Sequence, residues 1–239
     1  MPAPDGHTLL FTSSSSLVVT PHTMKLAYDP LRDLEPILPV VSNLPALAIG
    51  NHVPAKSVAE FIAHAKANPG KLTYASPGAG TYSHVTMEYL KHLAGIDMVH
   101  VPYGGSSPVL TDMLGGRIDA YLVAFSVFQE LEKQGRLRVL AMATEAKHAL
   151  RPELPTIAET VPGYELVLWY GIFAPARTPE PILDRLNAEM AKLADSAEVR
   201  ERLSKEGATA IRSTRAELGD RARNDLQRWR EIVRSLPPM

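Results

Sequence analysis

Cysteine is absent from the 239 residues of this sequence, which excludes disulfide bonds, thiolate metal ligands and cysteine nucleophiles. No apolar run approaches the roughly 18 residues that a membrane-spanning helix needs. Residues 1–6 do not resemble the charged start of an export signal, so nothing in the sequence as written directs export. Lysine and arginine together number 25, against 26 aspartates and glutamates. Because neither sign is in excess, we expect no nucleic-acid partner.

The usual motifs of enzymes are also missing. The hydroxyl-rich loops hold neither a G-x-S-x-G nucleophile turn nor a Ser-x-x-Lys pair, and the eight histidines show no H-E-x-x-H or i, i+4 pairing. Gly78-x-Gly80 begins like a dinucleotide-binding loop, but Ser83 stands where the third glycine belongs and the next strand ends without an acidic residue. We therefore expect no catalytic residue, no metal and no cofactor.

Short apolar runs alternate with segments of helical periodicity along nearly the whole chain. This alternation predicts an α/β fold with mostly parallel sheets. Helix starts are marked by capping boxes at Ser57, Thr156 and Thr214, each followed three residues later by glutamate. The middle of the chain consists of consecutive strand-helix units, which should form one lobe.

The segment from Ser76 to His84 holds small and hydroxyl residues between an expected strand and an expected helix. Backbone N–H groups at a helix start, together with the helix dipole, bind anions, and glycines let the backbone come close to them. A carboxylate is therefore a natural ligand. The plainer alternative is that the glycines only form a tight turn, that Ser83 only caps the helix and that His84 is a structural histidine.

Two further loops repeat this chemistry, one after the next expected strand and one near the start of the chain. In open α/β sheets, ligands lie beyond the carboxyl ends of the strands, so similar loops at these ends predict a shared cleft. For the serine run near the start of the chain, a solvated polar turn is the alternative. The candidate ligand-binding residues are Thr12, Ser13, Ser14, Ser15, Ser76, Gly78, Ala79, Gly80, Thr81, Ser83, His84, Tyr103, Gly104, Gly105 and Ser106.

Several motifs occur in the order of a known family. They are Pro4-Asp5-Gly6-His7-Thr8-Leu9-Leu10, Tyr28-Asp29-Pro30, Pro54-Ala55-Lys56-Ser57, Val101-Pro102-Tyr103, Leu110-Thr111-Asp112-Met113-Leu114-Gly115-Gly116, Leu154-Pro155-Thr156, Pro162-Gly163-Tyr164 and Trp169-Tyr170-Gly171. In this order the chain resembles, over nearly its whole length, the solute receptors of tripartite tricarboxylate transporters, also called the Bug family.

The resemblance implies a periplasmic binding protein of type II, a two-lobed Venus flytrap without enzymatic activity. It would close on a di- or tricarboxylate as a monomer and deliver it to membrane permease subunits. The first lobe would comprise 1–45 and 169–239, and the second 46–168. The family's ligand loops map onto the three loops above. An enzyme on the same scaffold and an orphan sensor or regulatory binding protein stay open as alternatives.

The sequence departs from the family in two places. Val123-Ala124 stands where members often carry an Asp-Asn pair. The family's leader and first strand-helix-strand are missing before Met1, so we expect a first lobe that is truncated at its N-terminus.

Overall fold

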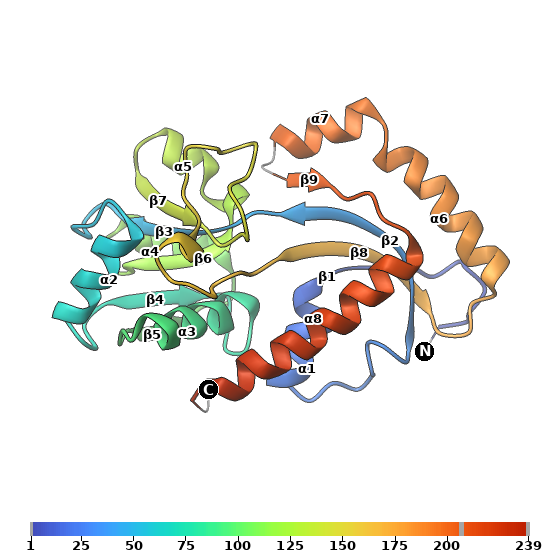
Figure 1. The fold of residues 1–239 in the computed structure, drawn as a ribbon, viewed down its shortest axis with the longest axis horizontal. Coiled ribbons are helices and arrows are strands. Elements are labelled where there is room, and N and C mark those ends of the chain that lie inside the picture. Colours follow the sequence, from blue (N-terminus) through green and yellow to red (C-terminus); the bar gives the residue numbers. More distant parts are fainter. Residues whose placement is uncertain (1, 206–207, 238–239) are drawn as a thin grey trace. The chain divides into compact units, whose positions relative to one another are not determined.

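The structure is a computed structural model that describes residues 2–205 and 208–237. Its chain folds into two compact units, each built around one sheet (Figure 1). The first unit holds 2–43 and Leu168–Ser235, and the second holds Leu44–Val167 with 236–237. The α/β class expected from the sequence is confirmed. Closure of the two units on a ligand stays a prediction.

The first unit has a four-stranded sheet in the order β1-β8-β2-β9, and all its pairings are antiparallel. Its elements are β1 (Leu10–Ser13), η1 (Ser15–Val19), α1 (Thr20–Thr23), β2 (Leu34–Asn43), β8 (Leu168–Pro175), α6 (Glu180–Ala194), α7 (Ala197–Lys205), β9 (Ala208–Ala210) and α8 (Arg215–Ser235). The last helix opens with the expected capping box, because Thr214 and Glu217 each accept the other's backbone N–H, at 3.2 and 2.7 Å.

Trp169 ties three parts of the first unit together. Its side chain is fully buried, and its indole Nε1 donates to Asp225 Oδ2 of α8 at 2.7 Å. Its backbone N–H donates to Ser14 Oγ at 3.2 Å. Burial raises the pKa of Asp225, while the Trp169 hydrogen bond and the nearby Arg221 and Arg228 oppose this effect.

The second unit has a five-stranded sheet in the order β5-β4-β6-β3-β7. Its elements are β3 (Pro45–Gly50), α2 (Val58–Ala67), β4 (Thr73–Ser76), α3 (Tyr82–Ala94), β5 (Val99–Pro102), α4 (Ser106–Leu114), β6 (Ala120–Ala124), η2 (Phe125–Val127), α5 (Gln129–Lys133), β7 (Leu137–Met142) and η3 (Ile157–Glu159). Ser57 caps α2 as expected, since its Oγ accepts the Glu60 N–H at 3.1 Å. Thr156 forms its capping box on a single 3-10 turn.

The expectation of mostly parallel sheets is wrong. Among the described strands, only β4 pairs in parallel, with β5 and with β6, and the other pairings in both sheets are antiparallel. A helix between two strands forces them parallel only when they become neighbours, as β4 and β5 do across α3. Strand β3 instead lies between β6 and β7, which come from much later in the chain, and the local pattern does not fix their direction.

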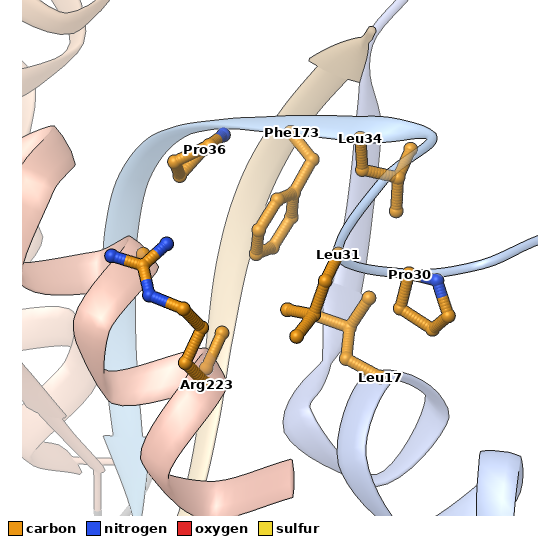
Figure 2. Close-up of a pocket in the computed structure, with 9 residues that line it drawn as sticks. Leu17, Pro30, Leu31, Leu34, Pro36, Phe173 and Arg223 are labelled. Carbon is orange, nitrogen blue, oxygen red and sulfur yellow. The ribbon is translucent and has the colours of Figure 1, made fainter.

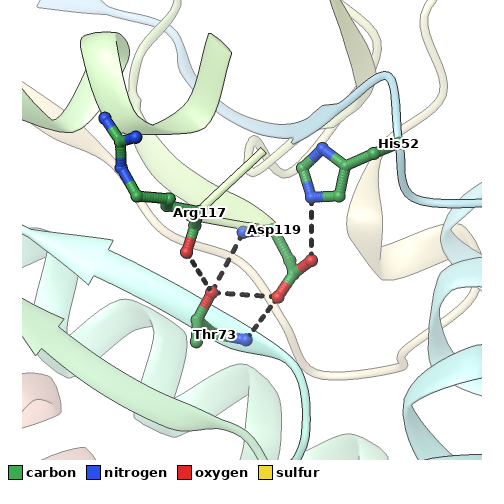
Figure 3. Close-up of polar contacts among 4 residues, drawn as sticks. All are labelled: His52, Thr73, Arg117 and Asp119. Atoms are coloured by element: carbon green, nitrogen blue, oxygen red, sulfur yellow. Dashed lines mark hydrogen bonds and ion pairs between the residues drawn. The ribbon is translucent and has the colours of Figure 1, made fainter. Parts of the chain in front are cut away.

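A polar cluster joins β4 and β6 at the end where both begin (Figure 3). Asp119 accepts the Thr73 N–H at 2.6 Å and the Thr73 hydroxyl at 2.9 Å through one carboxylate oxygen. Its other oxygen lies 2.9 Å from His52 Nε2. The Asp119 N–H returns a bond to Thr73 Oγ1 at 3.2 Å. These contacts fix the relative positions of the two strands, and hence of the residues at their far ends.

The hydrogen bond between Trp169 and Asp225 predicts how substitutions of Asp225 change the stability of the fold. Asparagine at this position still accepts the indole N–H and removes a buried charge, so D225N should unfold at an equal or higher temperature at pH 7. D225A leaves the indole N–H unpaired and should lose about 1–3 kcal/mol. Because the folded state raises the pKa of Asp225, its protonated form favours folding below about pH 3.8, and this contribution is lost as the pH rises.

Urea denaturation of the three proteins at pH 7 and pH 4 checks this. The advantage of D225N over the wild type should shrink in acid. Equal destabilisation by D225N and D225A would show that the carboxylate itself stabilises the fold.

Candidate functional site

Two loops of the second unit start side by side at the ends of β4 and β5. Ser76 pairs with Pro102 in parallel register, and the Tyr103 N–H donates to the Ser76 carbonyl at 2.9 Å. Each loop leads directly into a helix, α3 or α4. Among the described residues, no side chain forms a capping hydrogen bond at the start of either helix.

Within the first of these loops, hydroxyls bind the backbone of the loop itself. The Gly78 carbonyl accepts from Ser76 Oγ at 2.8 Å and from Thr81 Oγ1 at 2.7 Å. The Gly78 N–H donates back to Ser76 Oγ at 3.1 Å, and the Gly80 N–H donates to His84 Nδ1 at 2.9 Å. Three of the predicted residues, Ser76, Thr81 and His84, therefore shape the loop.

The two loops meet at one hydroxyl on β6. Tyr121 is fully buried, and its Oη lies 2.9 Å from Ser106 Oγ, at the start of α4. The Ser83 side chain, in the first turn of α3, also interacts with this hydroxyl. Burial raises the pKa of Tyr121 although both serines oppose the rise. Ser83 therefore does not cap its helix, and the structure brings the predicted residues Ser83 and Ser106 together.

Tyr103 belongs to the second loop, but its hydroxyl points into a different contact. It donates to Asp112 Oδ2 of α4 at 2.7 Å, and Asp112 also pairs with Arg117. Desolvation, followed by the hydrogen bond to Asp112, raises the pKa of Tyr103 to about 12. Tyr103 thus anchors the loop to α4 and leaves Gly104 and Gly105 to form its rim.

Behind the first loop, two histidine rings lie face to face. The ring centroids of His84 and His100 are 3.9 Å apart at an interplanar angle of 15°, and His100 Nε2 lies 2.7 Å from Ser76 Oγ. Tyr74 stacks on His100 at 5.0 Å and donates its hydroxyl to Glu88, which pairs with Lys91 at 2.7 Å. Burial raises the pKa of Tyr74, and the Glu88 carboxylate adds to the rise.

The remaining predicted residues form a separate group in the first unit. Thr12 and Ser13 lie on β1, opposite Gly171 and Tyr170 of β8. Ser14 is 2% exposed and accepts the Trp169 N–H, so its oxygen already has a structural partner. Ser15 begins the π-helix η1.

Comparison with known proteins identifies the family of this chain. The family model for tripartite tricarboxylate transporter family receptors matches residues 1–237. The chain belongs to this receptor family. Members of the family are periplasmic binding proteins rather than enzymes, so the chain is a solute-binding protein and the enzyme alternative is dropped.

Individual relatives agree with this assignment. A UPF0065 protein from the tcbD-tcbE intergenic region of Pseudomonas sp. is 33% identical, covering 96% of this chain and 69% of that protein. Protein BugT of Bordetella pertussis is 30% identical, covering 97% and 72%.

Two solved structures of the family carry ligands. One is R. palustris Rpa4515 with adipate, with a TM-score of 0.91, 27% identity and coverage of 100% of this chain and 81% of that one. The other is MatC from Rhodopseudomonas palustris with bound malate, with a TM-score of 0.87, 28% identity and coverage of 97% and 81%.

Two residues that contact the loops of the receptor were not predicted from the sequence. Tyr121 lies within an expected buried strand, where a tyrosine hydroxyl requires a hydrogen-bond partner, and this requirement is a usable signal. His100 precedes the second loop on β5. Its stacking on His84 and its contact with Ser76, 24 residues away, left no local pattern.

A small pocket in the first unit is a poor alternative site for the receptor's ligand. Phe173, Leu17 and Leu31 face one another in it, with Arg223 of α8 at its side (Figure 2). Its volume of about 30 Å³ is far below that of a usual ligand pocket.

Residues 2–205 and 208–237 contain no cluster of three or more histidine, aspartate or glutamate side chains placed to hold a metal ion. None of the helices in these ranges combines the length and the apolar character needed to cross a membrane.

The shared Tyr121 hydroxyl makes a stability prediction. Y121F keeps the packed ring but leaves Ser83 and Ser106 without their common partner, so it should lose about 1 kcal/mol, the net contribution of a typical buried hydrogen bond or slightly more. Y89F is the matched control, because the Tyr89 hydroxyl is half-exposed and makes a long contact of 3.4 Å to Gly163 O. Urea denaturation should rank Y121F clearly below Y89F; equal stabilities would refute the bridging role.

Proposed function

We propose that this receptor binds a small organic carboxylate at the loops that follow β4 and β5 and delivers it to a membrane permease from the periplasm. The observation that carries the proposal is the convergence of Ser83, Ser106 and Tyr121 between two uncapped helix starts. Such a place offers hydroxyl donors, backbone N–H groups and two helix dipoles of the sign that attracts an anion. Neutral donors of this kind suit a carboxylate.

The predicted site residues divide into two roles under this proposal. Ser76, Thr81, His84 and Tyr103 hold the loops in shape through the contacts described above. The direct contacts then come from the loop rims and the helix starts, namely Gly78, Ala79, Gly80, Ser83, Gly104, Gly105 and Ser106. A contribution from Thr12, Ser13, Ser14 and Ser15 stays a prediction.

Two observations support a class of ligand, namely the ligands of related structures and the lack of a carboxylate at the end of β6. The two ligand-bound relatives hold adipate and malate, both of which are small dicarboxylates without an amino group. Strand β6 ends in Val123 and Ala124, which offer no carboxylate to an ammonium group. A buried ammonium without a partner is unfavourable by several kcal/mol. Plain organic acids are therefore preferred over amino acids.

A substitution of Gly80 tests whether the loop after β4 holds the ligand. The Gly80 φ of 72° lies in the left-handed region, and this conformation costs alanine about 1–2 kcal/mol. G80A should shift the loop and weaken binding of adipate by about tenfold or more, equivalent to about 1.4 kcal/mol. Isothermal titration calorimetry with adipate and with malate measures this loss.

The matched control is G135A, because Gly135 also has a left-handed φ, of 66°, and lies in open space after α5. Both variants should lose similar stability, and only G80A should lose affinity. If both bind as the wild type does, the loop after β4 does not hold the ligand.

A matched pair of ligands tests the ligand class. Aspartate differs from succinate by one ammonium group, so the receptor should bind succinate at least about tenfold more tightly. Calorimetry at pH 7.5 compares the two. Tighter binding of aspartate would mean that an anion elsewhere in the site replaces the Asp-Asn pair of other members.

A further inference from the structure

The loop after β4 rests on an unusual pair of contacts with two histidines. His84 Nδ1 faces the Gly80 N–H at 2.9 Å, and an N–H group can only donate. His84 is therefore neutral, with its proton on Nε2. Ser76 Oγ, which accepts the Gly78 N–H and donates to the Gly78 carbonyl, lies 2.7 Å from His100 Nε2. Each ring thus holds one end of the turn that runs from Ser76 to Gly80.

We propose that His84 and His100 are positioning residues of the carboxylate site, and that their stacked pair must be neutral for the loop to hold its binding shape, so that acid releases the ligand. This inference rests on the proposed function of the loop. His84 is 5% exposed and acts through Gly80, and the half-buried His100 acts through Ser76.

Protonation breaks the arrangement in two ways. A proton on His84 Nδ1 turns the acceptor into a donor that faces the Gly80 N–H, and two donors repel. Two imidazolium rings whose centroids are 3.9 Å apart repel as well. The other charged or titratable groups facing the rings are Tyr74 of β4 and, on α3, Glu88 and Lys91. Glu88 is bound to Tyr74 and Lys91, so its charge is already shared with other partners.

The electrostatic surroundings agree with this geometry. Burial lowers the pKa of His84, Glu88 opposes this shift, and Lys91 adds to it. Burial and the neighbouring His84 lower the pKa of His100 to about 4. The unfolded chain takes up these protons near pH 6.5, before the folded chain does. The stability that the neutral pair contributes is therefore present above pH 6.5 and is lost as the pH falls toward about 4.

The first experiment needs no ligand. Nuclear magnetic resonance of the 239-residue chain follows the imidazole signals of His84 and His100 and the hydrogen exchange of the Gly80 amide between pH 7.5 and 3.5. We expect both rings to stay neutral below pH 6.5 and the Gly80 amide to lose its protection when they titrate. Rings that titrate near pH 6.5, or a Gly80 amide that exchanges freely at pH 7.5, would overturn the proposal.

The second experiment measures adipate affinity over the same pH range. H84N keeps an acceptor near the Nδ1 position but cannot take up a proton, and H92N alters an exposed histidine of the same helix. Wild type and H92N should lose affinity by up to about tenfold per pH unit for each proton taken up. H84N should keep a flatter profile, and its ratio to the wild type cancels the protonation of adipate itself.

H100Q provides a second variant that keeps a polar group near Ser76. Parallel pH profiles for wild type, H84N and H100Q would overturn the proposal. A wild type that binds adipate, malate and succinate at no pH would contradict the proposed function instead. The Gly80 exchange and the imidazole titrations would still decide the role of the two histidines in that case.

Discussion

The loop between β4 and α3 binds most of its own polar groups, although Ala79 is exposed and Gly78 and Thr81 are half-buried. The Gly78 carbonyl accepts hydrogen bonds from two hydroxyls, and the Gly78 N–H donates to the Ser76 hydroxyl. The Gly80 N–H donates to the ring of His84. With these groups satisfied internally, the loop keeps a defined shape before any ligand arrives. Under the proposed function, this preorganisation reduces the conformational entropy that the loop loses on binding.

The same requirement extends outward from the loop into the second unit. Ser76 is held by His100 and Gly80 by His84, and the two rings stack, with His84 buried and His100 half-buried. A buried polar network is stable only if each member is satisfied, which accounts for the chain of contacts through Tyr74, Glu88 and Lys91. On the other side, Tyr121 joins the two loops through serines. The site is therefore one connected network.

Much of this could be predicted from the sequence, because helices and strands follow local periodicity and the glycine-hydroxyl loops are visible as motifs. Strand direction could not, since β3 lies between strands that occur much later in the chain. The sequence also did not show the proposed division between residues that contact the ligand and residues that support the loop. Ser76 and Ser83 look equivalent in the sequence, yet one hydroxyl is bound within its own loop and the other reaches β6. Such differences arise from contacts between residues far apart in sequence.

Several arginines of the second unit already bind other groups of the protein. Arg117 pairs with Asp112, Arg151 with Glu132 and Glu153, and Arg138 donates to the Ala55 carbonyl. A bidentate guanidinium would hold a carboxylate through charge-assisted bonds about twice as strong as those of neutral donors. A receptor has to release its ligand as well as capture it. Under the proposed function, the serine, tyrosine and backbone donors make capture depend on the loop shape, so that a small change in that shape releases the ligand.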